Sequence, residues 1–129
     1  MKGVWVGLSL LAVAGLATGC GGSADGGQSG SGSVPANAVK VNVQASNWKW
    51  TLDQTTFKVG VPVDFRVQAT EGAHGFSIAG TNINRTVAQG QDPVDVVWTP
   101  DKPGTYTIQC SVYCGTGHGT MQTQITVTP

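Results

Sequence analysis

Apolar side chains recur at every second position along most of this chain from residue 39 onward. Such alternation over short segments is typical of strands that bury one face, because successive side chains of a strand point to opposite sides. Turn signals rich in glycine and proline separate the segments, and no stretch shows sustained helical periodicity. The pattern therefore predicts an all-β fold, an antiparallel β-sandwich of seven to eight short strands. The alternating runs begin at Val39, Trp48, Val61, His74, Val94, Tyr106 and Met121.

The beginning of the chain has the composition of a targeting segment. Lys2 precedes a chargeless, mostly apolar stretch from Val4 to Gly19. This stretch is shorter than the ~20 residues of a spanning helix but suits a signal peptide, which we expect over residues 1–19. The sequence LATGC at its end resembles a bacterial lipobox, in which the cysteine, here Cys20, carries a lipid after cleavage. An uncleaved anchor with an incidental cysteine is the alternative.

A Gly/Ser-rich stretch, GGSADGGQSGSGS, follows Cys20. It has too few apolar side chains to fold, so residues 20–33 are expected to be a lipidated cysteine and a tether. The remaining residues, 34–129, suffice for one small core. These features predict an exported domain that a lipid anchors to the outer face of the bacterial cell membrane.

The charge of the chain is balanced, with 7 Lys and Arg against 7 Asp and Glu. No run of basic residues is present, which argues against nucleic acid as a partner.

Side chains that bind soft metals gather near the end of the chain. The segment CSVYCGTGHGTM, residues 110–121, holds Cys110, Cys114, His118 and Met121, and His74 lies upstream. With Cys20 set aside, these five are all the cysteines, histidines and methionines of the predicted domain. Alternation turns the first and last residues of the segment toward the core, and the glycines between them allow close wrapping. The segment and the upstream histidine therefore predict a metal site.

Each of these residues has another explanation when taken alone. His74 could be a core histidine, Met121 could fill space in the core, and the two cysteines could form a disulfide in an oxidising compartment. Zinc would accept two cysteines and two histidines, but a methionine thioether favours copper. His74, Cys114, His118 and Met121 alone match the ligands of a mononuclear blue-copper site. Cys110 then adds a second thiolate, which can bridge a second copper ion.

The motif Cys-x₃-Cys-x₃-His-x₂-Met of residues 110–121 resembles the binuclear copper A (CuA) motif. That motif occurs in subunit II of cytochrome c oxidases and in the C-terminal domain of nitrous oxide reductases. The stretch HGFSIAGTNIN, residues 74–84, is similar to the histidine strand of subunit II, especially in B-type haem–copper oxidases. The resemblance covers about residues 39–129 and implies a cupredoxin-like Greek-key β-sandwich with two copper ions per chain. It implies bridging thiolates from Cys110 and Cys114, terminal ligands from His74 and His118, an axial Met121 and a backbone carbonyl from Val112.

The resemblance also implies a function in electron transfer. Such a centre accepts electrons from a cytochrome c or similar donor and passes them to a haem–copper oxidase. The stretch NWKW, residues 47–50, resembles the aromatic stretch of subunit II near the donor surface, and Trp48 matches its electron-entry tryptophan. Ordinary packing in a strand is the alternative for Trp48 and Trp50. We expect no catalysis by the chain alone, because oxygen reduction would need a separate haem–copper subunit I.

The chain departs from the family pattern in three respects. Val112 stands where mitochondrial-type members carry an acidic residue that helps bind magnesium, which valine cannot do. Typical subunit II proteins have one or two spanning helices, whereas this chain offers only the short signal-like segment. It also has no Cys-x-x-Cys-His motif, so we expect the donor cytochrome to be a separate protein. The alternative functions are a copper-binding chaperone lipoprotein and a free-standing copper electron carrier for another reductase.

Overall fold

The computed structural model describes Gly3 and residues 33–129. The predicted signal peptide, the predicted lipid attachment at Cys20 and the tether up to residue 32 lie outside the described residues. Within the described part of the chain, no helix has the length and hydrophobicity that crossing a bilayer requires.

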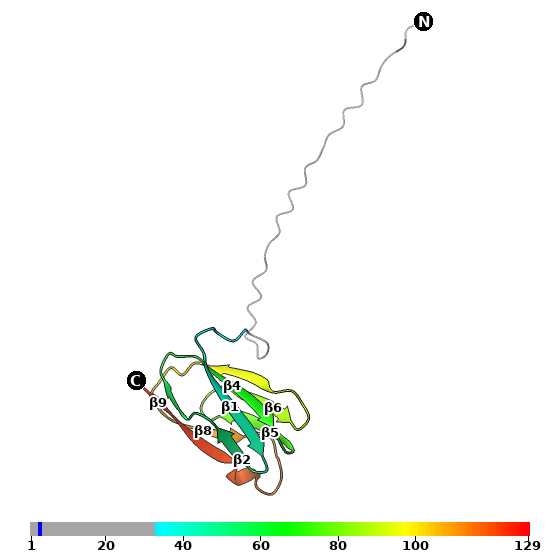
Figure 1. Ribbon diagram of the computed structural model, residues 1–129, viewed down its shortest axis with the longest axis vertical. Helices are drawn as coiled ribbons and strands as arrows, with labels where there is room; N and C mark the ends of the chain where they lie inside the picture. Colours follow the sequence, from blue (N-terminus) through cyan, green and yellow to red (C-terminus); the bar gives the residue numbers. More distant parts are fainter. Residues whose placement is uncertain (1–2, 4–32) are drawn as a thin grey trace. The chain divides into compact units, whose positions relative to one another are not determined.

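Nine strands and one short 3₁₀ turn make up the folded domain (Figure 1). They are β1 (Val39–Ser46), β2 (Lys49–Leu52), β3 (Thr56–Lys58), β4 (Val63–Ala69), β5 (Ala73–Ile78), β6 (Asn84–Ala88), β7 (Val94–Trp98), β8 (Gly104–Cys110), η1 (His118–Thr120) and β9 (Gln122–Thr128). Seven of the strands lie in the predicted alternating runs. The other two, β3 and β6, bury one side chain each, Phe57 and Val87, and so carry too little alternation to be recognised.

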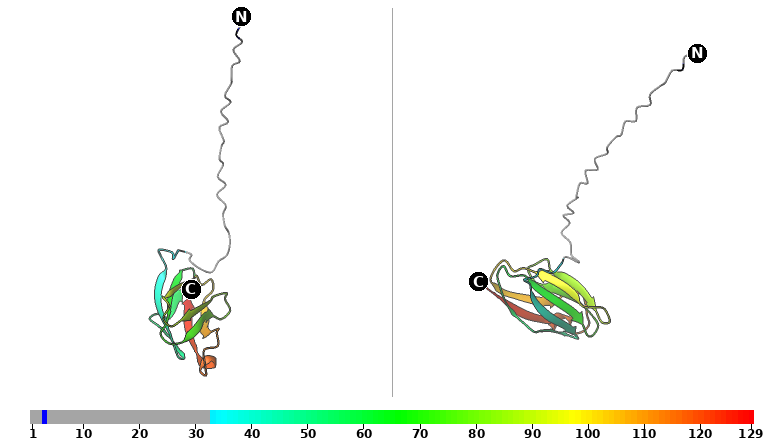
Figure 2. Two further views of the ribbon diagram at one scale, coloured as in Figure 1. Left: turned by 90° about the vertical axis from the view of Figure 1, so that its right-hand side faces the viewer. Right: turned by 45° about the horizontal axis from the view of Figure 1, so that its top comes forward.

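The strands form two sheets that pack face to face (Figure 2), which confirms the predicted β-sandwich. The first sheet has the order β2-β1-β4-β7, and the second has the order β3-β9-β8-β5-β6. The expectation of purely antiparallel pairing is wrong for two pairs, because β1 lies parallel to β4 and β3 lies parallel to β9. Between β1 and β4 the chain crosses to the other sheet to form β3, and such a crossover brings a strand back in the same direction.

The core lies between the sheets and follows the alternation of the sequence. In β1, for example, Val41, Val43 and Ala45 are buried while the residues between them are exposed. Phe65 on β4 is fully buried, and its ring contacts Phe76 with centroids 5.2 Å apart. Burying a large apolar side chain of this kind contributes about 1.5–3 kcal/mol.

Strand β5 differs from the half-buried strand that its alternation predicts. All of its residues from His74 to Ile78 are buried, on both faces of the sheet. On the outer face, Gly75 packs against the segment that follows β8, and the Ser77 hydroxyl donates to the Gln109 carbonyl at 2.7 Å. The segment after β8 therefore covers the outer face of β5 at Gly75.

Asp64 on β4 is a buried carboxylate, and its replacement by asparagine is expected to stabilise the fold at neutral pH. Its Oδ1 atom has no hydrogen-bond partner among the described residues. Burial is the main cause that raises the pKa of Asp64, and repulsion from Asp95 adds to it, whereas Lys40 and Arg66 act in the opposite direction. Because the pKa of Asp64 is higher in the folded state than in the unfolded chain, the folded state gains stability as the pH falls through the folded-state pKa. This gain ends when the pH reaches the pKa in the unfolded chain, about 3.9. The stability difference between Asp64→Asn and the unchanged chain should therefore be largest at neutral pH and shrink on acidification.

Thermal unfolding at several pH values measures this difference. A lower melting temperature for Asp64→Asn at pH 7 would contradict the prediction and show that attraction to Lys40 and Arg66 outweighs the cost of burial.

Candidate metal centre

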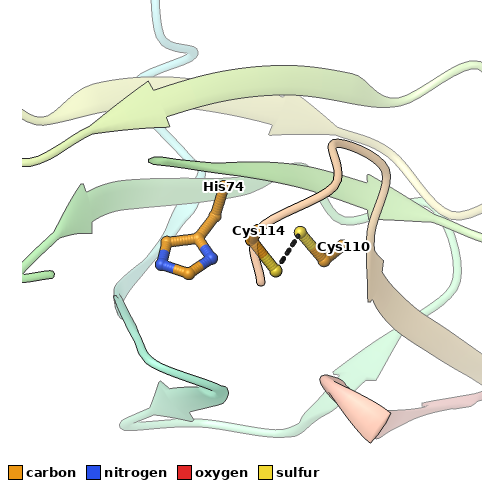
Figure 3. A group of neighbouring side chains, drawn as sticks. All are labelled: His74, Cys110 and Cys114. Carbon is orange, nitrogen blue, oxygen red and sulfur yellow. Dashed lines mark hydrogen bonds between the residues drawn. The ribbon is translucent and has the colours of Figure 1, made fainter. Parts of the chain in front are cut away.

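Three predicted ligands converge at one end of the second sheet (Figure 3). His74 comes from β5, Cys110 ends β8, and Cys114 lies in the loop that follows. The ligand atoms of these three side chains all lie within 4.8 Å of one another. Because β5 and β8 are hydrogen-bonded neighbours, with Phe76 opposite Cys110, two of the three ligands are held by the sheet itself.

The two thiols face each other without forming a disulfide. Cys110 Sγ lies 3.3 Å from Cys114 Sγ, and both cysteines are free. A disulfide would require a separation of ~2.05 Å. The backbone carbonyl oxygen of Val112, between the two cysteines, lies 3.0 Å from Cys110 Sγ. The sulfur atoms and this carbonyl thus gather on the same side of the loop.

The remaining two predicted ligands approach Cys114. Its Sγ lies 3.5 Å from Nδ1 of His118, which begins the 3₁₀ turn η1. It also lies 3.9 Å from Sδ of Met121, which is fully buried just before β9. The Cys114 sulfur is therefore near three other donor atoms, those of Cys110, His118 and Met121.

His74 presents a free nitrogen to this cluster. The side chain is fully buried, and its Nε2 lies 2.7 Å from the carbonyl oxygen of Glu71. A carbonyl only accepts, so Nε2 carries the proton and Nδ1 of the neutral ring has the lone pair. Nδ1 is buried and has no hydrogen-bond partner among the described residues. A buried lone pair beside two thiols fits a metal ion, and the carbonyl partner of the other nitrogen is the usual support of a metal-bound histidine.

The Cys114 thiol favours its neutral form in the absence of a cation. Burial raises the pKa of Cys114 to about 11, and the hydrogen bond with Cys110 contributes further. The loop from residue 111 to residue 121 contains no Asp, Glu, Lys or Arg. A bound cation would favour the thiolate form, because metal binding to cysteine displaces the thiol proton.

A close approach between Gly75 and the loop fixes the path of the chain between the cysteines. Ser111 N donates to the Gly75 carbonyl at 2.9 Å. A Cβ atom on Gly75 would collide with Ser111 Oγ and would lie 2.9 Å from the backbone nitrogen of Val112. Only a glycine on β5 allows this part of the loop to lie against the strand.

Two aromatic side chains lie at the surface beside the cluster. Trp48 is 38% exposed, and Tyr113, between the two cysteines, is 77% exposed. They are the large exposed hydrophobic residues of the described chain. The Trp48 indole donates to the Cys114 carbonyl at 2.8 Å, and the Tyr113 ring lies 5.6 Å from that of His118.

The sequence did not indicate three supporting contacts of the cluster. The carbonyl of Glu71 orients His74, but any residue has a carbonyl, so no sequence signal exists for it. Trp50 was expected to pack in a strand, and it also donates its indole proton to the Met121 carbonyl at 3.2 Å. The third contact is that of Gly75 with Ser111 and Val112, and a glycine in a strand does not by itself say what lies against it.

Comparison with known proteins relates the chain to oxidase subunits. No family model matches the chain. Over 62 residues it is 40% identical to cytochrome c oxidase subunit 2 of Thermus thermophilus, a match that covers 48% of this chain and 45% of the relative. The matched region thus spans less than half of the length of the curated relatives.

Solved structures share the fold. A chain of a heme–copper terminal oxidase dimer, determined by cryo-electron microscopy, is 31% identical with a TM-score of 0.61, covering 69% of this chain and 63% of that one. The periplasmic domain of subunit II of cytochrome oxidase from Bradyrhizobium japonicum superimposes with a TM-score of 0.67. That match covers 74% of this chain and 88% of the domain at 16% identity, so it bears on the fold alone.

Proposed function

We propose that this chain, which contains a subunit II-like cupredoxin domain of the copper A type, transfers single electrons through a binuclear copper centre. The electrons would come from a cytochrome c-type donor and pass to subunit I of a haem–copper oxidase. The observation that carries the proposal is the pair of free thiols 3.3 Å apart beside the unpartnered Nδ1 of His74, in a domain of this type.

Six residues are proposed to hold the metal. The thiolates of Cys110 and Cys114 would each bind both copper ions, and one histidine would bind each ion. The weaker donors would be the thioether of Met121 and the backbone carbonyl of Val112, consistent with the distances to the cysteine sulfurs. The histidine ligands would be His74 and His118. When bound, such a centre supplies a one-electron couple whose charge is shared by two ions.

The surroundings of the ligands suit rapid electron transfer. His74, Cys110 and Met121 are buried, and each belongs to a strand or directly precedes one. Burial excludes water, and attachment to paired strands limits how far the ligands can move when the charge changes. The protein would therefore contribute a rigid and dry site, while the metal supplies the redox chemistry.

The exposed aromatic side chains support donor docking at this end of the domain. Trp48 is proposed as the point of electron entry, because its indole is partly exposed and hydrogen-bonded to the carbonyl of Cys114. Tyr113 adds apolar surface beside it. Exposed aromatic side chains of this kind are suited to a brief encounter with a protein partner.

We further propose that the domain acts outside the cytoplasm, on the outer face of the cell membrane. The support is the signal-like segment of residues 1–19, together with the periplasmic location that the name of the Bradyrhizobium japonicum domain states for that protein. Attachment through lipidated Cys20 remains part of this proposal. Catalysis of oxygen reduction would belong to the partner subunit.

Metal analysis and electron paramagnetic resonance of the purified, copper-loaded chain test the proposed function. We expect two copper ions per chain and a seven-line hyperfine pattern, because one unpaired electron shared equally by two copper nuclei gives that pattern. Reduction by a cytochrome c should be rapid in stopped-flow measurements. Zinc-loaded protein, which has no unpaired electron, serves as the control.

The rival functions give different results in the same measurements. One copper ion with a four-line pattern would indicate a mononuclear blue-copper carrier. Copper that moves readily to a competing chelator, without a stable coloured species, would indicate a metal-delivery protein. Zinc alone, or a Cys110–Cys114 disulfide that survives careful reduction and metal loading, would refute the proposal.

A further inference from the structure

Two tryptophans of one short segment each donate a hydrogen bond to the backbone of a proposed ligand. Trp48 Nε1 lies 2.8 Å from the Cys114 carbonyl oxygen, and Trp50 Nε1 lies 3.2 Å from the Met121 carbonyl oxygen. Cys114 and Met121 are the two ends of the segment that also contains His118, which we call the ligand loop (residues 114–121). The two indoles thus contact both ends of the ligand loop.

The contact with Trp48 is steric as well as polar. A Cβ atom on Gly115 would lie 2.9 Å from Trp48 Cζ2, and one on Gly117 would collide with the side chain of Trp48. Gly117 has an ordinary φ of −92°, so its backbone conformation does not require glycine. The absence of a side chain at Gly117 is therefore explained by the indole that lies against it.

The backbone of the ligand loop has few other connections to the domain. Its own hydrogen bonds are local, from His118 N to Gly115 O and from Thr120 N to Gly117 O. Among the described residues, the bond from Trp48 is the one that joins the backbone of residues 114–120 to a residue outside the ligand loop. The three glycines of this segment would otherwise allow many conformations.

The Met121 end is held differently. Trp50 is buried, and its ring makes edge contacts with His74 and Phe76 at centroid distances of 6.2 and 5.6 Å. These contacts fix the direction of its indole N–H. The Met121 carbonyl also accepts from Cys110 N at 3.3 Å, so this end has a second backbone support that the Cys114 end lacks.

We propose that Trp48 and Trp50 are positioning residues that hold the ligand loop in its metal-binding shape before any metal arrives, with Trp48 the more important. The assignment of what the loop then binds rests on the proposed function, but the ordering of the loop does not. A loop that is already ordered loses less conformational entropy when an ion binds, and this favours binding.

Amide hydrogen exchange of the purified, reduced, metal-free chain tests the ordering directly. Trp48→Phe keeps an aromatic ring and removes the donor, and it should accelerate exchange in residues 114–120 by about threefold to tenfold, the expected effect of one lost hydrogen bond. Trp50→Phe should have a smaller effect because Cys110 N still contacts the Met121 carbonyl. Trp98→Phe, a buried tryptophan packed between Phe65 and Tyr106, is the control and should leave exchange in the ligand loop unchanged relative to global unfolding.

A double-mutant cycle at Gly117 separates the steric contact from general damage. Gly117→Ala should accelerate exchange in the ligand loop when Trp48 is present, and the effect should be much smaller in a Trp48→Ala background, where the ring is gone. Gly119→Ala is the matched control, because a Cβ atom at that position meets nothing within 4 Å. In copper-loaded protein, Trp48→Phe should also change the hyperfine splitting and accelerate copper release to a chelator, which a purely global loss of stability would not do.

The outcomes for the two proposals are distinguishable. Unchanged exchange of residues 114–120 in Trp48→Phe would overturn the positioning role even if two copper ions bind. Accelerated exchange in a protein that never binds two copper ions would support the positioning role and refute the copper A function instead.

Discussion

The Cys110→Ser variant is expected to lose the two-copper species completely. Cys110 Sγ lies 3.3 Å from Cys114 Sγ, and in the proposed centre both sulfurs contact both ions. A serine hydroxyl is a poor bridging ligand for copper, whereas His74, Cys114, His118 and Met121 still form the donor set of a mononuclear site. Copper content should fall to at most one ion per chain, and the seven-line pattern should give way to a four-line pattern.

Cys114→Ser should have the larger effect of the two substitutions. Its sulfur is the one that lies near Cys110, His118 and Met121 together, so its loss leaves no thiolate among these donors except Cys110. We expect copper affinity to fall by more than about 100-fold. This exceeds the loss expected when a residue that only supports a metal ligand is replaced. A chelator competition series measures this. Ser111→Ala, a neighbouring change that removes no proposed ligand, is the control for both variants. A two-copper signal that persists in Cys110→Ser would disprove the bridging role of Cys110.

Gly75→Ala is expected to disrupt the site without replacing any proposed ligand. The new methyl group would collide with Ser111 Oγ and would press on the backbone nitrogen of Val112. Crowding of this kind typically costs about 1–3 kcal/mol, and here the strain acts on the segment that joins Cys110 to Cys114. We expect a lower melting temperature in the metal-free protein and a weakened or heterogeneous two-copper signal after loading.

A second substitution shows which contact causes the damage. In Gly75→Ala combined with Ser111→Ala, the hydroxyl contact is gone but the contact with the Val112 nitrogen remains, so rescue should be partial. Gly119→Ala, in the same loop but with open space around it, should have little effect on either measurement. A fully stable Gly75→Ala protein with an unchanged signal would show that the loop can move away from β5 at no cost.

The side chains of each strand that point to the core could be predicted from the sequence, because alternate residues of a strand lie on the same face. Cys110 and Met121 were expected to point inward on this ground, and both are buried. The length of β3 and the parallel pairing of β1 with β4 could not be predicted in the same way. A three-residue strand shows almost no period, and the direction of pairing depends on which sheet the chain visits between two strands.

The supporting contacts of the site were harder to predict than its ligands. Cysteine, histidine and methionine are recognisable because few other residues bind soft metals, and their spacing places them in one loop. The partners of these ligands use groups that every residue or many residues carry, such as the carbonyls of Glu71 and Met121. Which of them meets which ligand is decided by the packing of strands that are distant in sequence.

The hydrogen bond from Trp50 to the Met121 carbonyl connects the two sheets beside the proposed site. His74 and Cys110 belong to the second sheet, whereas Trp50 belongs to β2 in the first. Any fluctuation that separates the sheets at this end would break the hydrogen bond from Trp50 to the Met121 carbonyl and admit water to the site. Occupancy of the site by an ion would oppose such opening by mass action, so a loaded chain should resist proteolysis at this end better than an empty one.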